Sequence, residues 1–341
     1  MSRTLLVLGA GPLQIPALRW AREAGLTSVV TSADARAKRL AGEFHSLSPC
    51  DVDAHLALTR VLARDGALAG VLVSDERGLR LLATLAGALA LPVPPRAALA
   101  LALEPARARE HWRAHGLVTN GSDEPRERFD VGGFFRDGAF VPAGCVERRA
   151  LPLASRVSEW GLCPPRLAGE ELAQAFVLAE RAARTLGITH GPVQVTLAAG
   201  ERGLALIELF PGFRDAVAAA HVTPLAYGKS PLQAWFGALA EAGGPFDELP
   251  LAPTATAGWM AVLPERTGFF AGVDGAARAR ALPGVVDLWL EEPGREIDSL
   301  SEPAAVCGFV WARGDDRNEL ERRLRAARAA LEVRVACRQV A

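Results

Sequence analysis

Short strand-like runs alternate with helical patterns over residues 1–95, and this alternation limits the possible folds more than any other feature of the chain. The runs Leu5–Leu8, Ser28–Thr31 and Ala69–Val73 each have the length and composition of a buried strand. Amphipathic segments lie between them, and Asp75 stands where it would cap the helix that follows the last run. Strands and helices in this order predict a parallel sheet that is covered on both faces.

The pattern changes after residue 95. A single helix is expected to end at His115, and a polar linker follows at residues 120–125. Beyond the linker, the pattern predicts two β-hairpins, over residues 130–146 and 192–210, separated by an amphipathic helix. Further strands are expected at residues 256–262, 285–289 and 305–312, before a charged helix at residues 316–331. An α/β N-terminal part is therefore expected to precede α+β structure.

A chain of 341 residues is too long for one ordinary hydrophobic core, so we expect several domains. The breaks in the pattern suggest an α/β domain at residues 1–95, a helix and linker at 96–128, an α+β domain at 129–245 and a small C-terminal α+β domain at 246–341.

Composition excludes several classes of partner. The formal net charge is −1, which gives no electrostatic basis for binding nucleic acid or an anionic membrane. Every apolar stretch is interrupted before about 18 residues, so no membrane span is expected. The cysteines are too far apart for a zinc or redox motif, and the first residues lack a cleavage-site pattern. We therefore expect a cytoplasmic protein with free thiols.

Three segments of the chain resemble the ATP-grasp superfamily, especially the branch near carbamoyl-phosphate synthetase, biotin carboxylase and amino-acid ligases. They are the strand–turn–helix at Leu5–Leu18, the segment Gly132–Gly138, and the hairpin formed by Val193–Leu197 with Ile207–Pro211. The resemblance implies a parallel-sheet pre-ATP-grasp domain, an ATP-grasp α+β domain and a small C-terminal domain. It also implies ATP, magnesium and an acyl phosphate in the active relatives.

The chain departs from this family where the nucleotide would bind. Active relatives carry a lid subdomain of about 60–70 residues, within the usual scale of small domains, before the strand that corresponds to Asp130. Here only Val118–Phe129 are available for it, so we expect the lid to be missing. Only Lys38 and Lys229 are lysines, and Glu104–Arg109 stand where the resemblance places a second phosphate-binding lysine. Arginine is not a direct replacement for that point charge.

The metal ligands are reduced as well. In the family, an acidic residue and a Glu-x-Asn motif on the second hairpin hold magnesium on the nucleotide phosphates. Gln194, Glu208 and Phe210 occupy these positions here. Magnesium prefers several hard, charged oxygen ligands, so Gln194 and Glu208 are expected to form only a vestigial metal site.

Two glycines after the first strand indicate a ligand-binding turn. Gly9 and Gly11 begin a dinucleotide fingerprint, but Gln14 replaces its third glycine. Thr31-Ser32 also stand where an acidic ribose ligand would follow the second strand, so a nicotinamide or flavin cofactor is not favoured. We expect Gly9, Gly11 and Gln14 to contact a small ligand, or the neighbouring domain, at the start of the first helix.

An arginine after the second hairpin is the remaining candidate for ligand binding. In relatives an arginine close to this point binds the substrate carboxylate, whereas here Gly212 occupies the corresponding position. Arg214 lies two residues further on. It is expected either to keep the carboxylate contact or to pair with Asp215 or another acid.

Two functions remain open, and no catalytic residue is assigned. The first is a degenerate ATP-grasp-like protein, a pseudoenzyme without a cofactor, which binds a small carboxylate, an amino-acid-like ligand or a partner protein. Loss of the lid would expose apolar surface and favour a homo-oligomer. The second is an active ATP-dependent carboxylate–amine ligase, which needs ATP, magnesium and an arginine such as Arg107, Arg148 or Arg149 on the phosphates. Whether the chain is an enzyme depends on which of the two is correct.

Overall fold

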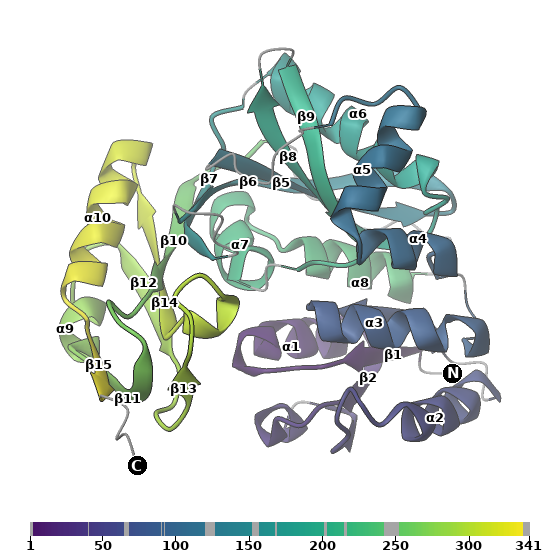
Figure 1. Cartoon of the computed structure of the whole chain (residues 1–341), viewed down its shortest axis with the longest axis horizontal. Helices are drawn as coiled ribbons and strands as arrows, with labels where there is room; N and C mark the ends of the chain where they lie inside the picture. The colour runs from purple at the N-terminus through teal and green to yellow at the C-terminus, as the bar shows by residue number, and fades with distance from the viewer. Residues whose placement is uncertain are drawn as a thin grey trace.

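The computed structural model describes residues 3–39, 41–64, 68–89, 91, 93–119, 127–151, 157–167, 169–200, 203–214, 217–241 and 252–336. Its strands form three sheets, of four, eight and three strands. Figure 1 shows the first sheet with its helices below the large sheet, and the C-terminal elements beside both. No helix in the described part of the chain is long and apolar enough to cross a membrane.

The N-terminal sheet is parallel, as the alternating pattern predicts. Its strand order is β3-β2-β1-β4. The strands are β1 (Arg3–Leu8), β2 (Leu26–Thr31), β3 (Glu43–His45) and β4 (Leu68–Val73), and the helices are α1 (Ile15–Glu23), α2 (Val52–Arg64) and α3 (Glu76–Leu85). Successive side chains of a strand point to opposite faces. Leu5 and Val7 therefore pack with α1, whereas Leu6 and Leu8 pack in the cluster that contains α2 and α3.

Local signals place the helix start that the sequence predicts. Asp75 precedes α3 and its Oδ1 accepts a hydrogen bond of 2.7 Å from the main-chain N–H of Gly78, as an N-cap does. The single helix expected to end at His115 is instead two helices, α4 (Arg96–Ala102) and α5 (Pro105–Ala114). Pro105 has no N–H and fits only the first turn of a helix, so a new helix begins there.

The large sheet is antiparallel throughout and has the strand order β12-β14-β10-β7-β6-β5-β8-β9. Its strands are β5 (Glu127–Arg136), β6 (Ala139–Ala150), β7 (Ser158–Cys163), β8 (Gly191–Gly200), β9 (Gly203–Phe210), β10 (Thr256–Val262), β12 (Val285–Leu290) and β14 (Gly308–Gly314). Strands from both sides of residue 245 thus share one sheet. Both predicted hairpins are present, as β5–β6 and β8–β9.

One face of the large sheet is apolar and covered by helices. Trp112 of α5 and Phe176 of α6 (Glu170–Thr185) belong to the same buried cluster as Val131, Val193 and Val195 of the sheet. Only residues 115–126 join α5 to β5, and this length cannot form a lid subdomain. The opposite face of β5, β8 and β9 is consequently not covered by such a subdomain.

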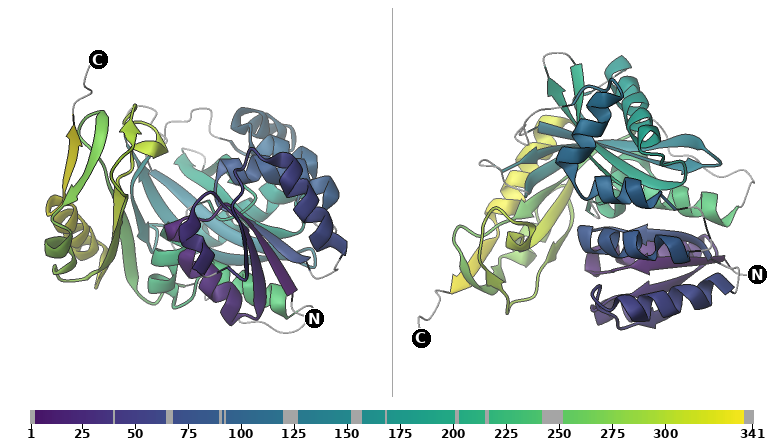
Figure 2. Two further views of the ribbon diagram at one scale, coloured as in Figure 1. Left: turned by 90° about the horizontal axis from the view of Figure 1, so that it is seen from below. Right: turned by 45° about the vertical axis from the view of Figure 1, so that its right-hand side comes forward.

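The remaining elements complete the core. The π-helix η4 (Ala218–Val222), α7 (Thr223–Tyr227) and α8 (Pro231–Ala240) belong to a cluster that includes α1 and the N-terminal sheet. The last part contains α9 (Ala276–Arg280), α10 (Arg317–Ala329) and a sheet of β13 (Glu296–Ile297), β11 (Gly268–Asp274) and β15 (Glu332–Ala336). Figure 2 shows these C-terminal elements on the side of the molecule away from α3 and α4.

Candidate functional site

Polar side chains form a row on the face of the large sheet opposite α5 and α6. Asp130 of β5 lies opposite Thr196 of β8, and Thr196 lies opposite Glu208 of β9. Gln194, two residues before Thr196, shares this face and lies opposite Phe210. Since Val193 and Val195 point into the apolar core, strand alternation directs these polar residues to the other side.

The structure brings Arg214, Glu208 and Gln194 together, and all three are residues that the sequence singled out. Arg214 Nη1 lies 2.7 Å from Glu208 Oε2. The main-chain N–H of Arg214 donates to Gln194 Oε1 at 3.1 Å. The guanidinium carbon also lies 5.3 Å from the centre of the Phe210 ring. Arg214 thus pairs with an acid of the protein, Glu208, whereas its contact with a ligand carboxylate stays a prediction. Asp215 lies outside the described residues.

A second ion pair lies on the same face. Asp130 is buried and pairs with Arg148 of β6, whose Nη2 donates to Asp130 Oδ1 at 2.9 Å. Thr196 Oγ1 donates to the same oxygen at 2.8 Å, and Arg148 Nη1 donates to Ser158 Oγ at 2.6 Å. Two arginine–carboxylate pairs thus stand on either side of Thr196.

The surrounding arginines keep Glu208 ionised. Burial alone would raise the pKa of Glu208, but the positive charges of Arg214, Arg148 and Arg128, with the hydrogen bond from Arg214, hold it below its ordinary value. The group is therefore a carboxylate at neutral pH.

The donor set does not fit magnesium. Glu208 and Gln194 each direct an oxygen to Arg214, and Phe210 is buried in the cluster of Val73 and Leu79 from the N-terminal part. Magnesium requires several oxygen ligands in octahedral geometry, and the approach to Glu208 is taken by a fixed positive charge. In the part of the chain that the structure describes, no group of three or more His, Cys, Asp or Glu residues is placed to hold a metal ion.

Gly212, which stands where the resemblance places a substrate-binding arginine, lies too close to the N-terminal sheet to carry a side chain. A Cβ atom at Gly212 would lie 2.6 Å from the carbonyl oxygen of Val73, at the end of β4. This distance is shorter than real Cβ contacts and the obstacle is main chain, so any side chain would force the loop away from the N-terminal sheet. The loop after β9 therefore closes directly on the parallel sheet.

The predicted turn at Gly9, Gly11 and Gln14 lies at the same edge of that sheet. β1 and β4 are neighbours with Leu8 opposite Val73, so the turn after β1 begins beside the strand end that Gly212 contacts. The N–H of Gly9 donates to Thr31 O at 2.8 Å, and the N–H of Gly11 donates to Gln14 Oε1 at 2.8 Å. Both N–H groups therefore donate to acceptors of the protein itself. Ligand binding by this turn stays a prediction.

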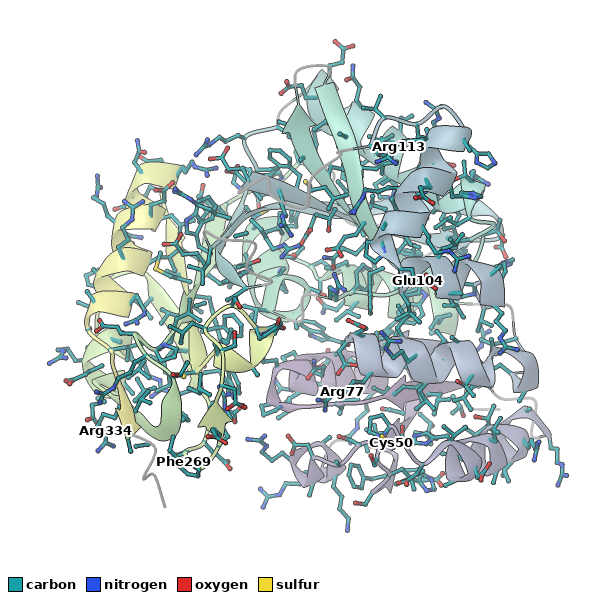
Figure 3. The ribbon with its side chains drawn as sticks, viewed as in Figure 1. Cys50, Arg77, Glu104, Arg113, Phe269 and Arg334 are labelled. Carbon is teal, nitrogen blue, oxygen red and sulfur yellow. The ribbon has the colours of Figure 1, made fainter. Side chains whose placement is uncertain are left out.

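Of the three arginines considered for phosphate binding, only Arg148 lies in the row. Arg107 pairs with Glu104 at 3.1 Å, and Figure 3 shows Glu104 at the start of α5. Arg149 points to the other face and lies 4.0 Å from Glu159. Sequence reasoning missed Asp130 and Thr196, although their alternation with buried residues could have placed them beside Glu208.

This architecture, a parallel N-terminal sheet joined to a large antiparallel sheet with a polar face, is the ATP-grasp fold. The whole chain resembles solved members of that class. It superposes on an L-amino acid ligase from Bacillus licheniformis with a TM-score of 0.81 and 15% identity, covering 98% of this chain and 99% of that one.

Two further structures match over a similar extent. Phosphoribosylglycinamide synthetase from Anaerococcus prevotii matches with a TM-score of 0.73 and 13% identity, covering 98% of this chain and 100% of the other. N5-carboxyaminoimidazole ribonucleotide synthetase from Thermotoga maritima matches with a TM-score of 0.71 and 14% identity, again covering 98% and 100%. Identities this low show the fold alone.

The sequence itself has a narrower match. Residues 260–336 match the family described as L-amino acid ligase C-terminal domain 2. No curated protein matches the sequence significantly. The match covers the C-terminal strands and α10, and it leaves the polar row outside.

Proposed function

We propose that this protein is a ligand-binding member of the ATP-grasp fold class without efficient ligase activity. Its ligand is a small carboxylate of amino-acid-like character, bound at the polar row around Arg214. The proposal includes a cytoplasmic location, because free thiols fit a reducing compartment.

One observation carries this proposal: Arg214 pairs with Glu208 and donates its N–H to Gln194, the two residues that the resemblance assigns to a metal ion. Phosphoryl transfer depends on cations that are positioned on the phosphates, and a cation already paired with a protein carboxylate is a poor substitute. A small zwitterion suits the row better. Its carboxylate would compete for Arg214 or Arg148, and its ammonium group would lie near Glu208 or Asp130.

A second function has support of its own. The match of residues 260–336 to an L-amino acid ligase domain, with the structural similarity to such a ligase, favours an active ATP-dependent ligase. In that case an anionic nucleotide would have to draw Arg214 away from Glu208, and Arg148 would contact the phosphates.

Calorimetry with ATP and magnesium separates the two functions. We expect the wild-type protein to show no magnesium-dependent ATP binding, beside an L-amino acid ligase as positive control. Magnesium-dependent binding, with phosphate release when L-amino acids are added and loss of that release in Glu208→Ala, would instead establish the ligase.

A thermal-shift panel of L-amino acids and short dicarboxylates tests the proposed ligand. We expect at least one compound to raise the Tm of the wild type, and Arg214→Met to weaken its binding by about tenfold, as loss of a charge-assisted contact should. Arg39→Met is the matched control, because Arg39 is exposed on another part of the molecule. No response to the panel, or equal responses in Arg214→Met and wild type, contradicts the proposal.

Self-association is the remaining part of the proposal. Loss of the lid would leave apolar surface that a second copy would cover, and light scattering that gives a monomer at all concentrations would contradict it.

A further inference from the structure

A cavity of about 390 Å³ lies between the N-terminal sheet and the large sheet. Val71 of β4 and Leu82 of α3 line one side, and Phe135 of β5 and Trp235 of α8 line the other. Its volume falls in the range of small-molecule sites, and such sites occur often where two parts of a protein meet. Of the loop that carries Arg214, only Pro211 is a lining residue, so this cavity is separate from the polar row.

The walls of the cavity are predominantly apolar. Leu91, Val93, Pro94 and Pro192 add to the apolar residues already named. β4 and α8 approach each other closely at Gly70. A Cβ atom at this position would lie 2.8 Å from a methyl carbon of Leu239 on α8. A ligand that fills this space must therefore have an apolar body.

The polar residues of the cavity have an excess of positive charge. Among the described lining residues, Arg3, Arg136 and His190 stand with one acid, Asp137. The Asp137 side chain is 83% exposed, whereas that of Arg136 is 17% exposed, so the acid lies at the rim and the arginine lies inside. An anionic group on the ligand would complement this charge.

The two arginines are held in place by the end of α8. Arg3 donates to the carbonyl oxygen of Leu239, and Arg136 Nη2 donates to that of Glu241 at 3.2 Å. Arg136 Nε also lies 3.7 Å from Asp137 Oδ2, whereas none of the ion pairs found among the described residues involves Arg3. Arg3 is held by a main-chain oxygen and has no paired acid among the described residues, so it is preorganised for an anion.

We propose that this cavity binds a compact apolar carboxylate, with its hydrocarbon part between Val71 and Trp235 and its carboxylate at Arg3. The site is independent of the polar row and of the function proposed for it.

Isothermal titration of the full chain with octanoate tests this assignment, with octan-1-ol as a neutral probe of the same length. We expect octanoate to bind and octan-1-ol to bind at least about tenfold more weakly, because only octanoate can neutralise Arg3. Arg3→Gln should weaken octanoate binding by about tenfold, and Arg3→Lys should retain most of it. Arg39→Gln serves as the control for a change of net charge.

A cavity-filling variant locates the hydrocarbon part. Ala238 of α8 lines the cavity, and Ala238→Phe should remove octanoate binding while the Tm shows that the protein is folded. If that variant does not fold, the comparison of Arg3→Gln with Arg3→Lys and the comparison of octanoate with octan-1-ol still test the proposal. Equal affinities for the two probes, or unchanged octanoate binding in Arg3→Gln or in folded Ala238→Phe, overturns the proposal. Arg214→Met should leave octanoate binding unchanged, so failure at one site does not count against the other.

Discussion

Arg214 reaches back from the loop after β9 to Glu208 on that strand, and its Nη1 lies 2.7 Å from Glu208 Oε2. The same residue receives support through its main chain, because its N–H donates to Gln194 Oε1 on β8. A positive charge that belongs to the protein thus lies against residues of two neighbouring strands, Gln194 of β8 and Glu208 of β9. The consequences for stability, pH dependence and loop geometry can be measured.

Removal of Arg214 should leave Glu208 as a partly buried carboxylate without its nearest counter-charge. We expect Arg214→Ala to lower the free energy of unfolding by about 1–3 kcal/mol. Glu208→Gln in the same chain should recover part of this loss. Urea denaturation of the two single variants and the double variant gives the coupling energy, and a coupling of zero would show that the pair does not form.

The lowered pKa of Glu208 predicts the direction of a pH effect. A carboxylate whose folded pKa lies below its ordinary value, near 4.5, stabilises the protein above that value and loses its contribution as pH falls through the folded pKa. The difference in unfolding free energy between wild type and Glu208→Gln should therefore be constant near neutral pH and shrink only below pH 4.5.

In Arg214→Met the folded pKa of Glu208 should be higher than in the wild type, because its burial is then opposed by fewer charges. As the pH falls, Arg214→Met should therefore lose less stability through Glu208 than the wild type does. Urea unfolding from about pH 7 to about pH 3 tests both variants. A difference that is independent of pH would contradict this account of Glu208.

Gly212→Ala should disturb the contact between the loop after β9 and the N-terminal sheet. The added Cβ would lie 2.6 Å from Val73 O, and we expect a loss of about 1–3 kcal/mol in the free energy of unfolding. Gly87→Ala is the matched control, since nothing lies within 4 Å of its Cβ position. Equal unfolding midpoints of the two variants in urea would show that the loop yields without cost.

A buried carboxylate joins the large sheet to α10. Glu147 is fully buried and accepts hydrogen bonds from Arg317 at 2.7 and 2.9 Å and from the N–H of Arg166 at 2.8 Å. Because Arg317→Met leaves this charge without its main partner, we expect a loss of about 3–5 kcal/mol. Arg325→Met, which breaks an exposed pair with Glu321, should cost less than about 1 kcal/mol. Thermal melts of both variants measure the contrast.

Much of the fold followed from local patterns. The parallel order of the first strands, the cap at Asp75 and the hairpin at β5–β6 each depend on residues close together in the chain. The hairpin turn has both Asp137 and Gly138 in the left-handed region, at φ values of 50° and 76°, which suits the Gly there. The break at Pro105 was missed because the helical pattern continues on both sides of it.

The candidate site was predictable only as separate pieces. The sequence pointed to Gln194, Glu208 and Arg214 one by one, since each falls in or beside a segment that resembles the family. It did not pair Arg214 with Glu208 rather than Asp215, because the curvature of a loop is not visible in a linear pattern. It gave no sign of Asp130, and it named Arg148 only as one of three arginines that could contact phosphates. The place of both residues in the row depends on the register of four strands.

The sequence by itself determined which chemical groups the protein has to work with. It carries two lysines, a segment too short for a lid subdomain, and a phenylalanine at position 210, where the resemblance places a metal ligand. The tertiary structure alone decided that Arg214 meets Glu208, that Gly212 closes on Val73, and that a cavity with Arg3 at its edge lies between the two sheets. Residue identity sets charge and size, whereas strand register and packing bring distant residues within a few ångströms of each other.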